Sequence, residues 1–221
     1  MDKNSKFYSR AKFVFAPILR FFMRIKPVGA ENVPLKGGVI LCSNHISALD
    51  VISIAAVCPR QLTFVSKKEL FSIPLLGCLI KKFGAIKVDR GSNDVRAIKA
   101  SVNAAQEGKV LSIFPQGTRC PGVNPKTTPI RHGAALIAYH SKCNVIPVCL
   151  KIKNGKYAFL RKIEVVFGEL IPYSELGFEN GGREEYTRAA DLIFEKITSL
   201  ADYSYLPPYE PKQAKKAKKR K

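Results

Sequence analysis

This 221-residue sequence has no apolar run long enough to cross a membrane. A spanning helix needs about 20 consecutive apolar residues. The N-terminal run Phe13–Leu19 is far shorter, and basic residues flank it. Pro17 and Arg20 also interrupt the apolar core that a cleaved signal peptide needs, and no small-residue cleavage site follows. We therefore expect neither a membrane span nor a cleaved signal.

Acidic residues are scarce: 17 Asp and Glu stand against 37 Lys and Arg, for a formal net charge of +20. So large a basic excess predicts a polyanionic partner, which is a phosphorylated substrate, an anionic membrane surface or a nucleic acid. A nucleic-acid-binding protein is the less favoured reading. The sequence has no recognisable helix-turn-helix or zinc-finger spacing and no aromatic-basic interleaving of the kind that binds single-stranded nucleic acid.

The cysteines form no C-x-x-C pair and show no zinc-ligand spacing, so no metal site is expected. Several lie in apolar runs, which predicts buried free thiols in a reducing compartment. The six are Cys42, Cys58, Cys78, Cys120, Cys143 and Cys149.

A segment rich in Phe and basic residues runs from Lys3 to Lys26. Helical spacing puts its apolar side chains on one face and its basic ones on the opposite face. Such a helix favours an interfacial membrane anchor, although a helix packed on the domain with its charges in water fits too. A second apolar patch, Ile73–Ile80, is also too short to span a membrane, and we expect it to lie in the core. The shared apolar face comprises Phe7, Ala11, Val14, Ile18, Phe22 and Ile25.

The central feature of the sequence is His45 with Asp50 five residues later. Before them, Gly37–Cys42 predicts a buried strand, and Val51–Val57 after them predicts a helix. The chain can fold back at such a turn, so a carboxylate can fix the tautomer of the imidazole and leave its other nitrogen free as a base. No Ser or Cys at a strand-to-helix elbow accompanies the pair, so the base would activate a hydroxyl of the substrate. A polar turn with a helix-capping Asp is the alternative reading.

Strand and helix patterns alternate along the rest of the chain. This order predicts an α/β fold with a mixed, largely parallel sheet flanked by helices. We expect three regions: an amphipathic membrane-associating segment at 1–28, a single domain at 29–206 and a disordered basic tail at 207–221. One strand, Val110–Phe114, ends in a turn whose backbone N–H groups and Arg119 suit a phosphate. A hairpin is expected between Tyr157–Phe159 and Ile163–Phe167.

Four blocks in order resemble the glycerolipid acyltransferases, most closely the bacterial 1-acyl-sn-glycerol-3-phosphate (lysophosphatidate) acyltransferases. They cover most of the chain from Gly29 to Leu170. The blocks are Asn44–Asp50 (H-x4-D), Gly84–Arg90 with Lys67–Leu70 and Ile73–Gly77 before it, Phe114–Arg119, and Val145–Val148.

The resemblance implies a reaction: His45 is the general base, Asp50 orients it, and the sn-2 hydroxyl of the acceptor attacks an acyl thioester with no acyl-enzyme. Phosphatidic acid would be the product. The acyl donor would be acyl-CoA or acyl carrier protein, used as a co-substrate, and no cofactor is implied. Substrate-binding residues carried over from the family are Lys67, Arg90, Gln116, Gly117, Thr118 and Arg119, with Pro147 in a structural or acyl-group role. A protein without a span that acts on membrane lipids is expected at the cytoplasmic face of the cell membrane, peripheral or monotopic.

The third block departs from the family at Gln116, where Glu usually precedes Gly-Thr-Arg. Glutamine keeps the shape but loses the charge. We expect this change to leave Arg119 without a carboxylate partner and to affect acceptor choice, with glycerol-3-phosphate or another lysophospholipid as the alternatives. A non-catalytic lipid-binding relative is disfavoured because both His45 and Asp50 are present.

Overall fold

Seven strands form one sheet in the order β1-β7-β6-β2-β5-β3-β4 in the computed structural model, which describes residues 3–89, 94–158 and 160–211. The strands are β1 (Ile25–Val28), β2 (Val39–Ser43), β3 (Leu62–Lys67), β4 (Ala85–Val88), β5 (Val110–Ile113), β6 (Asn144–Ile152) and β7 (Ile163–Phe167). All neighbours pair in parallel except β6 and β7. The mixed, largely parallel α/β sheet expected from the sequence is confirmed.

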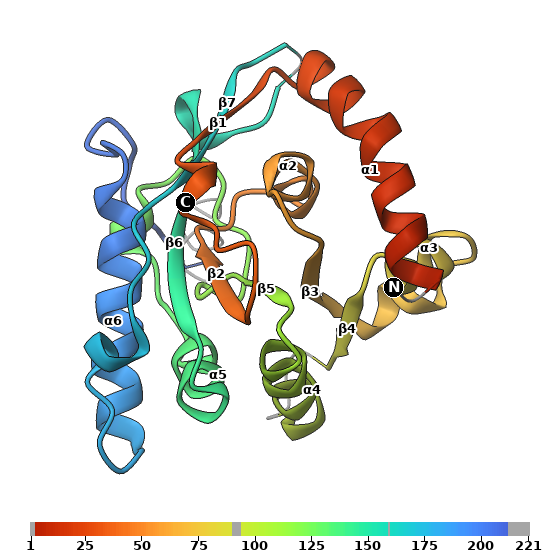
Figure 1. Ribbon diagram of the computed structural model, residues 1–221. Helices are drawn as coiled ribbons and strands as arrows, with labels where there is room; N and C mark the ends of the chain where they lie inside the picture. The colour runs from red at the N-terminus through yellow and green to blue at the C-terminus, as the bar shows by residue number, and fades with distance from the viewer. Residues whose placement is uncertain (1–2, 90–93, 159, 212–221) are drawn as a thin grey trace.

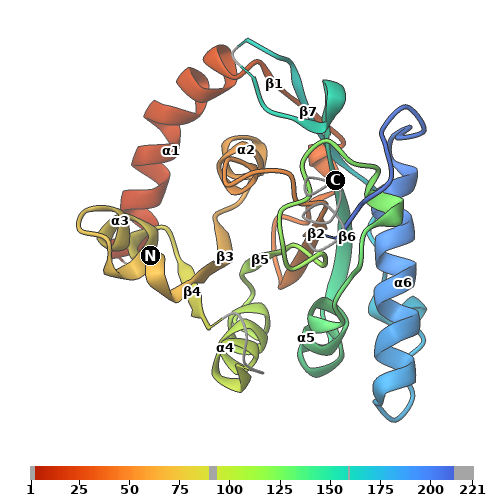
Figure 2. The same ribbon diagram turned by 180° about the vertical axis from the view of Figure 1, so that it is seen from behind.

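Helices cover both faces of the sheet (Figures 1 and 2). On one face lie α4 (Val95–Gln106), α5 (Gly133–Ser141) and α6 (Arg183–Ser199). On the other face lie α2 (Asp50–Val57) and α1 (Lys3–Phe22), and α1 reaches across α2 toward the short α3 (Leu76–Lys82). Because both faces are covered, the central strands are apolar on successive residues rather than on alternate ones.

Strand β2 shows this two-sided burial. Val39 and Leu41 pack into the core on the α2 side, whereas Ile40 and Cys42 pack into the core beneath α5 and α6. All four side chains are fully buried. The strand is therefore fixed from both sides, and the loop after Ser43 begins from a rigid base.

The expectations about the N-terminal segment need correction. The helix ends at Phe22 instead of continuing to Lys26, and Ile25 is a buried residue of β1, which pairs with β7. The segment 1–28 thus contributes a strand to the sheet. Arg24 turns the chain between the two elements with φ +48°.

The apolar patch Ile73–Ile80, expected in the core, lies at the surface. Leu75 is 88% exposed, and Ile73, Leu76 and Leu79 are also exposed. Cys78 is exposed as well, unlike the other five cysteines, which are buried free thiols. The domain carries this patch outside the sheet, in the segment that links β3 to β4 (Figure 1).

The prediction that β7 forms a hairpin with Tyr157–Phe159 was also wrong. Tyr157 and Ala158 are not in a strand, and β7 pairs antiparallel with β6 instead. Phe159 lies outside the described residues. At the other end of the chain, Pro207 and Tyr209 are joined to the loop after β5 by hydrogen bonds to Asn124 and Thr127. The remainder of the expected tail, 212–221, lies outside the described residues.

Candidate active site

The carboxyl ends of β2 and β5 lie side by side, because these two strands pair in parallel from Val39 and Val110 onward. His45 follows β2, and the Phe114–Arg119 turn follows β5. Residues that follow neighbouring parallel strands emerge at the same edge of a sheet, which is where ligands bind in α/β folds. This strand order brings two of the motifs together.

Asp50 holds the His45 ring and the turn around it. Its Oδ2 lies 2.6 Å from His45 Nδ1 and also accepts the backbone N–H groups of Ile46, at 2.6 Å, and Ser47, at 2.9 Å. Because a carboxylate is an acceptor, Nδ1 carries the proton and Nε2 is left with its lone pair. His45 is 7% exposed and Asp50 is fully buried.

Two further groups surround this pair. The Phe114 ring stacks on the imidazole, with centroids 4.1 Å apart and planes 18° apart. Tyr157 lies 3.1 Å from Ser53 on α2 through its hydroxyl oxygen. Burial first, and then the charge of Asp50, raise the pKa of Tyr157 above its ordinary value, so the phenol stays protonated near the carboxylate.

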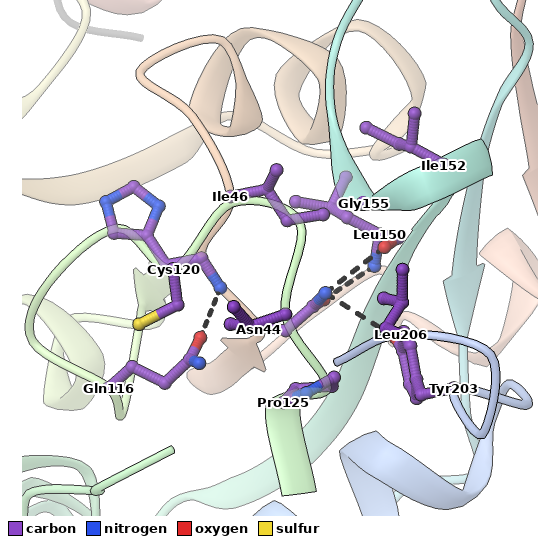
Figure 3. A pocket seen from close by; sticks show the side chains of 12 residues that line it. Asn44, Ile46, Gln116, Cys120, Pro125, Leu150, Ile152, Gly155, Tyr203 and Leu206 are labelled. Atoms are coloured by element: carbon purple, nitrogen blue, oxygen red, sulfur yellow. Dashed lines mark hydrogen bonds between the residues drawn. The ribbon is translucent and has the colours of Figure 1, made fainter. Parts of the chain in front are cut away.

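Asn44 fastens the turn to the neighbouring strand. Its Oδ1 accepts Leu150 N–H at 2.7 Å, and its Nδ2 donates to the Leu150 carbonyl at 3.1 Å. Figure 3 shows this side chain reaching toward Leu150 of β6, and its Nδ2 also lies 3.5 Å from the Tyr203 hydroxyl. The amide takes the place of the next backbone pair in the β2–β6 ladder, so the backbone at His45 is free to leave the sheet.

The turn after β5 is joined directly to the His45 turn. Cys120 N–H donates to the His45 carbonyl at 2.8 Å, and Gln116 Oε1 accepts His45 N–H at 2.6 Å. Figure 3 shows the Gln116 side chain pointing at that backbone nitrogen. The Thr118 and Arg119 side chains, which precede Cys120, are exposed beside it.

Gly117 is required by the geometry of this turn. Its φ is +63°, and a Cβ there would lie 2.7 Å from Cδ of Arg131, whose side chain packs against it. Gly117 N–H donates to the Phe114 carbonyl at 2.9 Å, so it closes the turn. The phosphate site expected at this turn would therefore draw on side chains more than on this N–H.

The remaining residues expected at the site lie farther from the His45 turn or are not described. Lys67 ends β3, the neighbour of β5, and is exposed at the same edge of the sheet. Pro147 lies inside β6, opposite Cys42. Arg90 lies outside the described residues. Among residues 3–89, 94–158 and 160–211, no group of three or more His, Cys, Asp and Glu side chains could hold a metal ion.

Gln116, which was expected among the substrate-binding residues, is 3% exposed, and its amide is bonded to His45 and Thr128. Thr128, Tyr157 and Tyr203 were not anticipated at the site. All three lie outside the four sequence blocks, so no local pattern placed them there.

A histidine–carboxylate pair at the carboxyl end of a strand is suited to removing a proton from a hydroxyl or a water. The chain belongs to the Acyltransferase family, whose model matches residues 24–151.

Among curated proteins, a 1-acyl-sn-glycerol-3-phosphate acyltransferase of Bacillus subtilis is 31% identical over 180 residues, which are 80% of this chain and 87% of that protein. The protein of the same name from Helicobacter pylori is 34% identical over 126 residues, 54% of this chain and 53% of that one.

The fold is also that of a solved structure. The crystal structure of 1-acyl-sn-glycerophosphate acyltransferase from Thermotoga maritima matches with a TM-score of 0.64 at 23% identity, covering 90% of this chain and 78% of that one.

Proposed function

We propose that this chain transfers a fatty acyl group from a thioester to the sn-2 hydroxyl of 1-acyl-sn-glycerol-3-phosphate, which gives phosphatidic acid for phospholipid synthesis. The observation that carries the proposal is the 2.6 Å contact of His45 Nδ1 with Asp50 Oδ2 at the carboxyl edge of the sheet. A relative that matches along most of the chain is a 1-acyl-sn-glycerol-3-phosphate acyltransferase, which supports the choice of acceptor.

His45 is the general base in this reaction. Its Nε2 takes the proton of the acceptor hydroxyl while that oxygen attacks the thioester carbonyl. The new C–O bond forms as the C–S bond breaks, and the proton passes from the imidazolium to the departing thiolate. Asp50 stabilises the imidazolium formed in between and keeps Nδ1 protonated. No covalent acyl-enzyme is formed.

Arg119 binds the phosphate of the acceptor, together with Thr118 and, from β3, Lys67. The Arg119 side chain is exposed one residue before Cys120, whose N–H is bonded to the His45 carbonyl. A guanidinium makes short, charge-assisted bonds to phosphate oxygens. The anchored turn would thus hold the acceptor headgroup at a fixed distance from the base.

The acyl donor is a thioester of coenzyme A or of acyl carrier protein, and it serves as a co-substrate rather than a resident cofactor. The basic surface, with a net charge of +20, favours both carriers because each is strongly anionic. Comparing the two thioesters at equal acyl-chain length distinguishes them.

Helix α1 holds the protein on an anionic membrane surface, at the cytoplasmic face of the membrane. No helix in the described part of the chain is long and apolar enough to cross a bilayer. Helix α1 packs on the domain through Tyr8 and Ala16, which leaves most of its large apolar side chains exposed, with Phe21 77% and Phe22 57% accessible. An uncovered aromatic face beside basic side chains suits the headgroup boundary of a bilayer.

An acyl-transfer assay of the full chain tests this function. Lysophosphatidate, glycerol-3-phosphate and other lysophospholipids are offered with both thioester donors, and lysophosphatidate should be the preferred acceptor. His45→Ala should lower kcat by about 100- to 10,000-fold while the circular-dichroism spectrum is unchanged.

His140→Ala, which removes an exposed histidine at the end of α5, is the control and should keep full activity. Turnover close to wild type in folded His45→Ala would end the proposal, as would transfer to every acceptor except lysophosphatidate.

A further inference from the structure

Gln116 lies in a chain of buried hydrogen bonds that starts at His45. Its Oε1 accepts His45 N–H at 2.6 Å, and its Nε2 lies 2.7 Å from Thr128 Oγ1. Thr128 in turn donates from Oγ1 to the Pro125 carbonyl at 2.7 Å. Both side chains are buried, at 3% exposed for Gln116 and 8% for Thr128.

The direction of every bond in this chain is fixed. A backbone N–H only donates, so the atom facing His45 N must be the amide oxygen, and the NH2 group must face Thr128. The Pro125 carbonyl only accepts, so the Thr128 hydroxyl gives it its proton and receives one from Gln116. A neutral amide therefore matches both ends without leaving a buried donor unpaired, which would be costly.

We infer that Gln116 is a positioning residue that fixes the backbone of His45, not a ligand of the acceptor phosphate, and that its neutrality extends the activity of the base to lower pH. This inference rests on the proposed role of His45 as the base. Gln116 has both ends of its amide engaged inside the protein, whereas Arg119 nearby is exposed and free to meet the acceptor.

The charge of this position matters because the His45 backbone nitrogen is only three bonds from the imidazole. A glutamate at 116 would still accept His45 N–H, and the Thr128 hydroxyl would turn from Pro125 to the second carboxylate oxygen. The Pro125 carbonyl would keep the Thr128 N–H bond, at 3.0 Å. The variant should therefore fold, but it places a buried negative charge beside the ring, which favours the imidazolium over the free base.

Other ionisable groups already surround His45, and all of them are the same in wild type and in Gln116→Glu. Asp50 lies on α2, Tyr157 precedes β7, Cys120 follows the β5 turn, Tyr203 lies in the C-terminal segment, and Arg131 packs against Gly117.

Kinetics of Gln116→Met separate the two roles. Loss of the amide leaves His45 N–H unpaired, so we expect kcat to fall by about 10-fold while KM for lysophosphatidate stays within about twofold. Thr128→Val removes the far end of the chain and should lower kcat less, and the double variant should lose little beyond Gln116→Met. A KM that rises about 10-fold with unchanged kcat would overturn the inference, as would no change in either constant.

Gln116→Glu tests the charge. The acid limb of the kcat/KM profile should move up by about one pH unit. Gln106→Glu, which adds the same charge on the exposed face of α4, is the matched control and should leave the limb in place.

NMR titration of the His45 ring gives a readout that needs no turnover. The three histidines are assigned with His132 and His140 variants, and the midpoint of His45 should rise in Gln116→Glu only. If wild type fails to acylate lysophosphatidate, the proposed function fails, yet the titration still decides this inference. An unchanged midpoint in folded Gln116→Glu would overturn it.

Discussion

Asp50 Oδ2 lies 2.6 Å from His45 Nδ1 and binds two backbone N–H groups of the same turn, so one oxygen fixes both the ring and the loop that carries it. The carboxylate thus acts on the position of the imidazole as well as on its tautomer. Their spacing of five residues matters because the intervening turn, rather than a straight helix, separates them.

Asp50→Asn should lower kcat by about 100- to 10,000-fold with little effect on KM. The amide can keep bonds to the backbone N–H groups, but it has no charge for the imidazolium and can hold the wrong tautomer. Steady-state kinetics check this expectation. Asp191→Asn, at an exposed position of α6, is the control. A folded Asp50→Asn protein within threefold of wild-type kcat would contradict it.

Arg119→Ala should raise KM for lysophosphatidate by roughly 10- to 100-fold and leave KM for the thioester unchanged, because a charge-assisted bond to phosphate is lost. Arg119→Lys keeps the charge without the bidentate geometry, so its KM for lysophosphatidate should lie between those of wild type and Arg119→Ala. Arg188→Ala, which removes an exposed arginine of α6, should behave as wild type. The role assigned to Arg119 is wrong if the acceptor KM does not move.

Replacing Phe21 and Phe22 by Ser should weaken binding to anionic vesicles by about 10-fold or more, at high salt as at low salt, because aromatic burial is not screened. Substitution is sharper than deletion of the helix, since α1 also supplies Ala16 to the core. Val95→Ser removes an apolar side chain that is 72% exposed elsewhere and should not affect binding.

Removing residues 212–221 gives the complementary result in the same co-sedimentation assay. These residues are mostly lysine and should contribute only a screened electrostatic attraction, lost at high salt. Tight high-salt binding by the Phe21 and Phe22 variant would place the anchor elsewhere, with the exposed Ile73–Ile80 patch as the next candidate.

Cys42 should make stability fall at alkaline pH. Burial in β2 raises the pKa of its thiol from 9.0 to about 12. The folded state thus holds this proton more tightly, so the stabilisation is complete below pH 9 and is lost as pH rises toward 12. Between about pH 8 and pH 10.5, the free energy of unfolding measured in urea should fall by about 2 kcal/mol more for wild type than for Cys42→Ala.

In Cys78→Ala, which removes the exposed thiol, the free energy of unfolding should fall as much as in wild type over that pH range. Equal losses in wild type and Cys42→Ala would show that this thiol does not ionise on unfolding.

Local patterns were sufficient for the class of fold and for the centre of the site. Apolar runs such as Gly37–Cys42, followed by helical segments, predicted buried parallel strands because only such strands are apolar on both faces. His45 and Asp50 could be paired from sequence because both belong to one short turn, so the contact depends on little else than the strand before it and the helix after it.

Contacts between distant segments depended on the order of the strands. Gln116 reaches His45 across 71 residues, and Asn44 reaches Leu150 across 106. Both contacts exist because β5 and β6 flank β2, which no local periodicity reveals. The same reason explains the two strand errors: Ile25 became a strand residue by pairing with β7, and β7 paired with β6 rather than with Tyr157–Phe159.

Exposure, too, was decided by the tertiary structure. The sequence makes Ile73–Ile80 and one face of α1 apolar. Apolar side chains favour burial against any non-aqueous surface, so the sequence alone does not say which surface covers them. Sheet and helices close around other side chains and leave both segments outside. The amino-acid sequence determined the chemistry available to this protein, whereas packing among distant elements decided which polar groups meet at His45 and which apolar groups remain exposed.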